Sequence, residues 1–203
     1  MQAARHSAAR RSGRWFTQHH FQHSENGAGF TLVEMLVVVG IFAIITAIVL
    51  VKNSQFSNVV LLRNLAYDVA LSIRQAQVFG LSVRATPESG VFTAGYGVHF
   101  DADAPTTYAL FADTNSNSRY DSGIDEVVET FTIARGNMID RLCGVSSSGV
   151  ETCGAPTLDV VFLRPDPEAI LTGVTGDARV YLAAPNGFEE SVLVRSTGQI
   201  SVD

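Results

Sequence analysis

The pattern of apolar and polar positions divides the chain into a long apolar run, an amphipathic stretch and a series of short alternating runs. Between Met35 and Val51 the only polar side chain is Thr46, and about 20 apolar residues are enough for a helix to cross a bilayer. We therefore expect a transmembrane helix over residues 30–51. Four arginines and one acid precede it, and a basic flank of this kind stays on the cytoplasmic side. The remainder of the chain is then predicted to be exported.

The helical pattern continues beyond the apolar run, but with apolar residues on one face only. No proline occurs between Phe30 and Phe79, and apolar residues recur there at spacings of three and four. They are Val59, Leu62, Ala66, Val69, Ile73 and Ala76. This pattern predicts an amphipathic continuation over residues 52–80 that packs on a core. Gly80 is its expected stop, because glycine accepts the left-handed conformation that ends helices.

From residue 81 onward, short runs of alternating apolar residues are divided by turn residues, which is typical of strands. The predicted strands are 81–85, 97–100, 108–112, 127–133, 158–163, 179–183, 191–194 and 199–202. The last two flank Ser196-Thr197-Gly198 and are expected to form a hairpin. One long helix followed by many strands predicts an α+β fold, in which the N-terminal helix packs on an antiparallel β-sheet domain over residues 81–203.

One acid, Glu34, lies just inside the apolar run. An ionised carboxylate costs roughly 2.5–3.5 kcal/mol at the centre of a spanning helix and less near its end. Either Glu34 reaches back to headgroups and water, or it pairs with a specific cation. Glu34 is the fifth residue from Phe30, and cleavage after the small residue Gly29 would create a new amino terminus there. An ordinary secretory signal differs, because its apolar core spans about 7–15 residues and its cleavage site follows the core.

The sequence GFTLVE at residues 29–34 resembles the type IV prepilin signature, Gly-Phe-Thr-Leu-x-Glu ahead of an apolar helix. The resemblance implies that a membrane-embedded prepilin peptidase removes a cytoplasmic leader, residues 1–29, by cutting after Gly29. The same enzyme would then methylate the new terminal residue, Phe30. The resemblance also gives Glu34 a partner, the terminal amine of a neighbouring subunit that enters a filament.

The order of one helix and many strands is also similar to that of the GspH/FimT family of minor pilins and pseudopilins, over residues 29–203. Segments that fit are 64–76, 111–113 and 194–200. The resemblance implies a non-catalytic component of a type II secretion pseudopilus, held in the inner membrane by one span with its C-terminal domain in the periplasm. Its partners would be the prepilin peptidase/methyltransferase, other pseudopilins or minor pilins, and an inner-membrane assembly platform. The alternative is a FimT/FimU-like minor pilin that acts in type IV pilus assembly or DNA uptake.

Charge argues against nucleic acid as a partner. Without the leader, the 14 basic and 20 acidic residues of the chain fall to 10 and 19, a net charge of about −9. Phosphate contacts need clustered lysine or arginine, and DNA-binding relatives resemble one another in a basic C-terminal loop. Here only Arg195 lies beside the last eight residues.

The two cysteines, Cys143 and Cys153, lie in a Gly/Ser-rich segment that would face an oxidising periplasm. A disulfide is the predicted state, and closing a loop of about 11 residues would stabilise the fold by somewhat under ~3 kcal/mol. Free thiols or a metal pair are the alternatives. A metal would need more ligands than the nearby acids Asp140 and Glu151.

A polar segment places oxygen-bearing side chains at alternate positions, as in the first half of an EF-hand calcium loop. These residues are Asp113, Asn115, Asn117 and Asp121. The match is incomplete, because Ser118 replaces the glycine and Ile124 replaces the bidentate glutamate. We favour a polar turn between strands, rich in Asn and Asp because these residues hydrogen-bond their own backbone. Calcium remains the alternative, and no other cofactor is expected.

Catalytic motifs are absent from the sequence. His99 is the only histidine outside residues 1–29, and a single histidine in a predicted strand is more often structural than catalytic. No HExxH pair, glycine-rich phosphate loop or nucleophile elbow occurs. The sequence therefore predicts an assembly component and not an enzyme.

Overall fold

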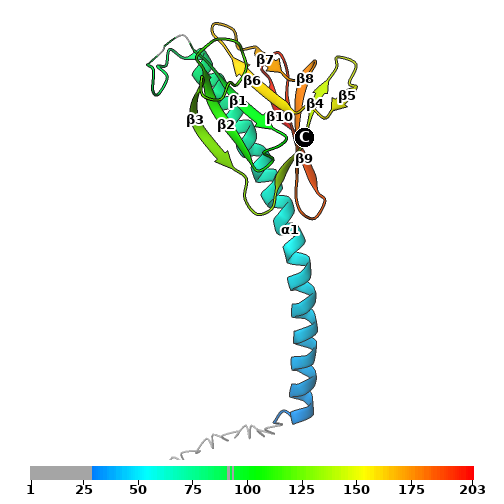
Figure 1. Cartoon of the computed structure of the whole chain (residues 1–203). Coiled ribbons are helices and arrows are strands. Elements are labelled where there is room, and N and C mark those ends of the chain that lie inside the picture. Colours follow the sequence, from blue (N-terminus) through cyan, green and yellow to red (C-terminus); the bar gives the residue numbers. More distant parts are fainter. Residues whose placement is uncertain (1–28, 91, 93) are drawn as a thin grey trace, which may run out of the picture. The chain divides into compact units, whose positions relative to one another are not determined.

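The structure is a computed structural model that describes residues 29–90, 92 and 94–203 (Figure 1). The chain divides into two compact units, Met1–Ile45 and Thr46–Asp203, and each is described by itself. Apart from Gly29, the predicted leader lies outside the described residues.

Among the residues that the structure describes, one helix, α1, runs from Leu32 to Leu81. Two expectations about its end were wrong. Residues 81–85 form no strand, because Leu81 is still helical and the Ser82 amide donates to the Val78 carbonyl at 3.0 Å. Gly80 does not stop the helix in a left-handed conformation either. A Cβ at Gly80 would lie 2.3 Å from the Phe162 carbonyl oxygen, so the glycine allows the helix to approach a strand closely.

The second unit contains two antiparallel sheets of five strands each. The first has the order β3-β2-β1-β6-β7 and the second β10-β9-β8-β4-β5. The strand bounds are β1 Gly95–Asp101, β2 Thr107–Asp113, β3 Glu126–Thr132, β4 Met138–Val145, β5 Glu151–Cys153, β6 Thr157–Phe162, β7 Ala169–Thr172, β8 Asp177–Ala183, β9 Glu189–Val194 and β10 Ile200–Val202. The α+β class and the antiparallel pairing agree with the expectation from sequence.

Seven of the predicted strands correspond to observed ones, and the hairpin of β9 and β10 is confirmed by their antiparallel register. Three strands were missed, namely β4, β5 and β7. In β4 the charged pair Asp140 and Arg141 interrupts the alternation, and a register shift occurs there in its pairing with β8. β5 and β7 have only three and four residues, too few to show a period of two.

The second half of α1 and the two sheets share one hydrophobic core (Figure 1). The helix contributes five side chains with no exposed surface, Leu62, Ala66, Val69, Ile73 and Ala76. They belong to the set that the spacing of three and four picked out. Val98 and Phe162 come from the first sheet, and Val180 and Leu182 come from the second. Each large side chain of this kind stabilises the fold by about 1.5–3 kcal/mol when it is fully buried.

A polar side chain also ties the helix to the sheets. The Gln77 amide donates to the Pro167 carbonyl at 3.0 Å and to the Gly198 carbonyl at 3.1 Å. Gly198 has a φ of 82° and lies in the turn between β9 and β10. Because Gln77 is 7% exposed, loss of its partners would leave a buried amide unsatisfied.

Candidate processing and assembly site

The start of α1 is a capped helix terminus. The Thr31 hydroxyl accepts a hydrogen bond from the Glu34 amide at 3.1 Å, and the Thr31 carbonyl accepts one from the Met35 amide at 3.1 Å. Thr31 is therefore the N-cap, and Glu34 occupies the third helical position. A threonine N-cap with a glutamate three residues later is the Thr-x-x-Glu pattern of a capping box. This role was not predicted, although the spacing of Thr31 and Glu34 is visible in the sequence. It supplies a local reason for an acid here, because negative charge is favoured at a helix N-terminus.

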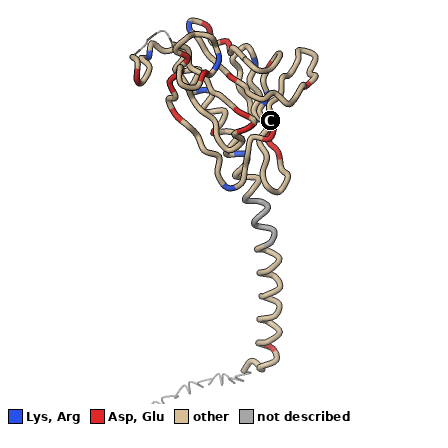
Figure 2. Tube along the Cα trace, in the orientation of Figure 1, with Lys and Arg blue, Asp and Glu red and all other residues tan. Residues whose placement is uncertain are grey.

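The Glu34 carboxylate also remains available to an external partner. Its side chain is exposed, and within residues 29–90, 92 and 94–203 it takes part in no ion pair. Glu34 is the one charged residue between positions 29 and 50, and the trace of this part of the helix in Figure 2 is tan apart from a red stretch near its start. A carboxylate in such surroundings can take a cation from another molecule.

The apolar run forms a helical surface with no cover from the chain itself. Residues Leu32–Leu50 have a mean hydropathy of 2.8, and none of this stretch is buried. Ile41, Ile44 and Ile48 are each more than half exposed. The segment is long and apolar enough to cross a membrane, and apolar surface of this extent requires lipid or other helices around it.

The motif at this helix start is shared with known proteins. The family model described as the prokaryotic N-terminal methylation motif matches residues 26–50. Searches of curated proteins and of solved structures gave no significant match.

The motif and the fold together support a type IV pilin-like protein, with an apolar N-terminal helix and a C-terminal antiparallel β domain. The motif implies processing by a prepilin peptidase and assembly with other pilins. The apolar helix fits a single-pass membrane anchor. Proteins of this class are typically structural.

The cysteine pair lies far along the chain, in the second sheet. Cys143 in β4 and Cys153 in β5 are direct cross-strand partners and are joined by a disulfide. The bond holds the three-residue edge strand β5 to its neighbour. Because both sulfur atoms are used in the bond, they are not free to bind a metal together with the adjacent Glu151.

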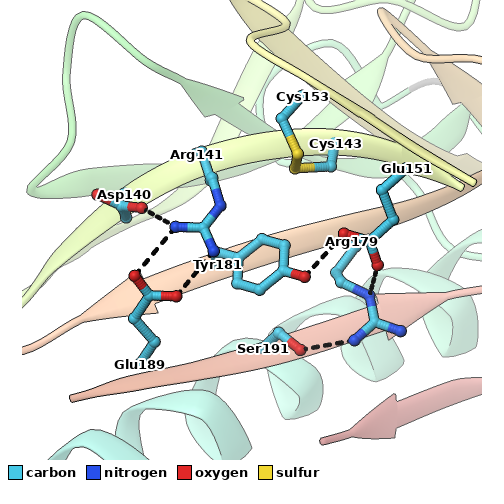
Figure 3. Close-up of a disulfide and its surroundings, with 9 residues drawn as sticks. All are labelled: Asp140, Arg141, Cys143, Glu151, Cys153, Arg179, Tyr181, Glu189 and Ser191. Carbon is cyan, nitrogen blue, oxygen red and sulfur yellow. Dashed lines mark hydrogen bonds and ion pairs between the residues drawn. A yellow bond between two sulfur atoms is a disulfide. The ribbon is translucent and has the colours of Figure 1, made fainter.

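An ionic cluster beside the disulfide adds to this attachment (Figure 3). Glu151 of β5 accepts a hydrogen bond from the Tyr181 hydroxyl at 2.8 Å and lies 3.1 Å from Nε of Arg179. Arg141 stacks 3.8 Å above the Tyr181 ring and binds both carboxylate oxygens of Glu189. These contacts join four neighbouring strands of the second sheet, β4, β5, β8 and β9. Holding these strands together is a sufficient reason for the charged residues to cluster here.

The calcium-like segment forms a turn that is closed by its own hydrogen bonds. Asp113 is 2% exposed, and its two carboxylate oxygens accept the amides of Asn117 and Ser118 at 3.2 and 2.8 Å. Burial raises the pKa of Asp113, and these backbone donors act in the opposite direction. The side-chain amides of Asn115 and Asn117 both donate to Asp121, at 2.9 and 2.6 Å. Those hydrogen bonds lower the pKa of Asp121.

The structure thus brings together all four residues of the candidate calcium set, in the arrangement of a polar turn. A third carboxylate, that of Asp125, accepts the amides of Thr114 and Asp121 at 2.9 and 2.8 Å. The Asn115 and Asn117 amide nitrogens, and not their oxygens, face Asp121. Calcium binding would require these side-chain amides to rotate so that their oxygens face the ion. Calcium therefore remains the less favoured alternative to a polar turn, and it is untested.

His99 has a buried partner that the sequence did not reveal. Its Nδ1 lies 2.6 Å from the Asp159 carboxylate, which belongs to the directly opposite residue of β6 and is 2% exposed. Tyr120 covers the imidazole, with ring centroids 4.7 Å apart. The contact links β1 to β6, and the structural role expected for His99 stays a prediction.

Proposed function

We propose that the chain is a minor pseudopilin of the GspH type, a structural component of a type II secretion pseudopilus. The observation that carries the proposal is the combination at the start of α1. Glu34 is exposed and unpaired among the described residues, and it stands five residues into the sequence that would begin after Gly29. The match to the N-terminal methylation motif supports the same maturation step.

Maturation would proceed at the cytoplasmic face of the inner membrane. The prepilin peptidase/methyltransferase cuts after Gly29 and methylates Phe30, and the apolar helix then anchors the subunit with its β domain in the periplasm. An assembly platform transfers the subunit from lipid to a filament, where Glu34 meets the terminal amine of its neighbour. Pairing inside an apolar environment stabilises both charges, since an isolated charge there is costly.

The β domain would lie among other minor subunits. Its disulfide fits an oxidising compartment. Its acidic balance does not favour a DNA partner, because 19 acidic residues face 10 basic ones once the leader is gone.

The experiment that tests this function compares a strain lacking the chain with its complemented parent. Culture-supernatant proteins and surface fibres are quantified in both. We expect the deletion to remove a defined set of secreted enzymes and to leave pili intact. An unchanged set of secreted proteins with lost fibres would contradict a secretion pseudopilin and indicate a minor pilin of the type IV pilus.

A further inference from the structure

A groove in the second unit runs between α1 and the outer strand of the first sheet. Its volume is about 260 Å³. The helix side carries Leu65, Asp68 and Leu71, and the sheet side carries Tyr108 and residues 131–133. Phe131 stacks on Tyr108 with ring centroids 4.8 Å apart, so the floor of the groove is aromatic.

The strand beside this groove has one unpaired edge. In the part of the chain that the structure describes, β3 pairs with β2 alone and is the outermost strand of its sheet (Figure 1). The Ile133 amide donates to Thr106 on the β2 side at 2.8 Å. Because amide directions alternate along a strand, the amides of Thr130 and Thr132 point to the free side. An edge of this kind is a template for pairing with another extended segment.

The helix side of the groove exposes apolar surface that the fold leaves uncovered. Leu71 lines the groove and is 66% exposed, and Tyr67, one turn earlier on α1, is 58% exposed. Their neighbours Val69 and Ile73 have no exposed surface. Tyr67 and Leu71 therefore lie on the side of α1 that the sheets do not cover, and Leu71 carries this exposed apolar surface into the groove.

Two carboxylates lie at or close to the groove. Asp68 lines it, and Glu129 precedes Phe131 by two residues in β3, on the same face of that strand. Asp68 and Glu129 are exposed and occur in none of the ion pairs formed by residues 29–90, 92 and 94–203. Burial raises the pKa of the Tyr108 hydroxyl, the hydrogen bond to Ser72 opposes the rise, and the charges of Asp68 and Glu129 add to it. Both acids add negative charge beside the aromatic floor of the groove, which favours a positively charged ligand there.

We propose that this groove and the free edge of β3 form a docking surface for one extended segment, rich in apolar and basic residues, of a neighbouring subunit. The segment adds a strand to the sheet at β3, its apolar side chains contact Leu71 and Phe131, and its basic side chains neutralise Asp68 and Glu129. Main-chain hydrogen bonds supply affinity in this mode of recognition, and side-chain pockets supply specificity. The proposed function enters at one point only: it is the reason for taking the partner to be a subunit of the same filament.

The test uses the full chain in detergent and a dye-labelled synthetic peptide of ten residues that alternates valine and lysine. A peptide that alternates valine and glutamate is the matched control. Fluorescence anisotropy should show binding of the lysine peptide and none of the glutamate peptide. Hydrogen exchange should show slower exchange at Thr130 and Thr132 when the lysine peptide is present. Failure of the lysine peptide to bind would overturn the proposal.

Variants separate edge pairing from charge attraction. Thr130→Pro removes an outward amide without touching the β2 ladder, and it should weaken binding about tenfold. Thr130→Ala keeps that amide and should bind as the parent does. Asp68→Asn with Glu129→Gln should weaken binding and flatten its dependence on salt. Equal binding by Thr130→Pro, with an unchanged melting temperature, would contradict docking at the edge.

Two further results show whether a second copy of the chain binds this surface, and whether the proposal stands apart from the proposed function. If the chain alone forms a dimer that Thr130→Pro dissolves, a second copy occupies the surface and the proposal is wrong. Because the peptide assay uses purified protein, its result is independent of secretion. A chain that binds the lysine peptide but is dispensable for secretion would overturn the proposed function alone.

Discussion

The two halves of α1 have the same backbone hydrogen bonds but opposite relations to their own chain. Over residues 32–50 no part of the helix is buried, whereas the second half places five side chains in the core with no exposed surface. Its apolar stripe receives cover from two sheets, while the uniformly apolar first half receives none. One continuous helix is therefore part of a folded domain at one end and depends on lipid or neighbouring helices at the other.

The largest expected effect comes from the acid in the first half. We predict that Glu34→Leu inserts into the membrane but is lost from purified filaments, because the terminal amine of the neighbouring subunit then has no partner. Carbonate extraction measures insertion, and immunoblotting of sheared filaments measures incorporation.

Glu34→Gln is the matched control for the capping role, since glutamine also completes a capping box. If charge pairing is decisive, Glu34→Gln should fail as fully as Glu34→Leu. Normal incorporation of Glu34→Gln would show that the cap, and not the charge, is what the filament requires.

Two isoleucines test the contrast between the halves directly. Ile73 has no exposed surface, and Ile44 is 63% exposed. We expect Ile73→Ala to lower the free energy of unfolding of the β domain by about 2–5 kcal/mol, because it leaves a cavity in the core. Ile44→Ala should leave that free energy unchanged. Denaturant unfolding of the full chain in detergent, followed by near-UV circular dichroism, measures both. Equal losses in the two variants would contradict the division of α1.

The disulfide should have a smaller effect. Replacing Cys143 and Cys153 together by serine should lower the free energy of unfolding by somewhat under ~3 kcal/mol, since the closed loop is short. Reduction of the parent protein should give the same loss, which controls for the change of side chain. If neither treatment changes the unfolding midpoint, the contacts of Glu151 with Arg179 and Tyr181 hold β5 without the bond.

Calcium is expected to have the smallest effect. The turn that contains Asp113 and Asp121 is already closed by its own donors, so we predict no heat on titration with millimolar calcium. Calorimetry of the full chain measures this. Heat that Asp121→Asn abolishes would reverse the prediction and establish a calcium site.

Periodicity predicted the helix because both of its apolar patterns are long. The apolar run from Met35 to Val51 can be recognised as helical without knowledge of the fold. The apolar positions from Leu62 to Ala76 repeat often enough to identify one face of the helix. Most strands were predicted from alternation over several residues, and the three-residue strand β10 was predicted from the turn that joins it to β9. β4 was missed because two adjacent charged residues, Asp140 and Arg141, interrupt its alternation. Arg141 pairs with Glu189 of β9, a contact that the local sequence does not reveal.

The site was predictable to the extent that it is local in sequence. Gly29, Phe30 and Glu34 lie within six residues of one another. By contrast, the acid that pairs with His99 lies 60 residues away, and the two carbonyls that accept from the Gln77 amide lie 90 and 121 residues away. The role of Gly80 could not be predicted from local sequence either. A glycine is needed there because the backbone of Phe162, in a distant strand, leaves no room for a Cβ. Such contacts depend on the arrangement of the sheets, which no local pattern contains. The capping role of Thr31 is the exception, since its spacing to Glu34 was visible and was overlooked.

The central claim is maturation at the start of α1, and the most direct test is the intact mass and N-terminal sequence of the chain isolated from native membranes. Parallel samples come from cells with and without prepilin peptidase. We expect a chain that begins at Phe30 with one added methyl group, and an uncut chain when the peptidase is missing. A chain that begins after the apolar run, or one that is uncut in both strains, would contradict the account.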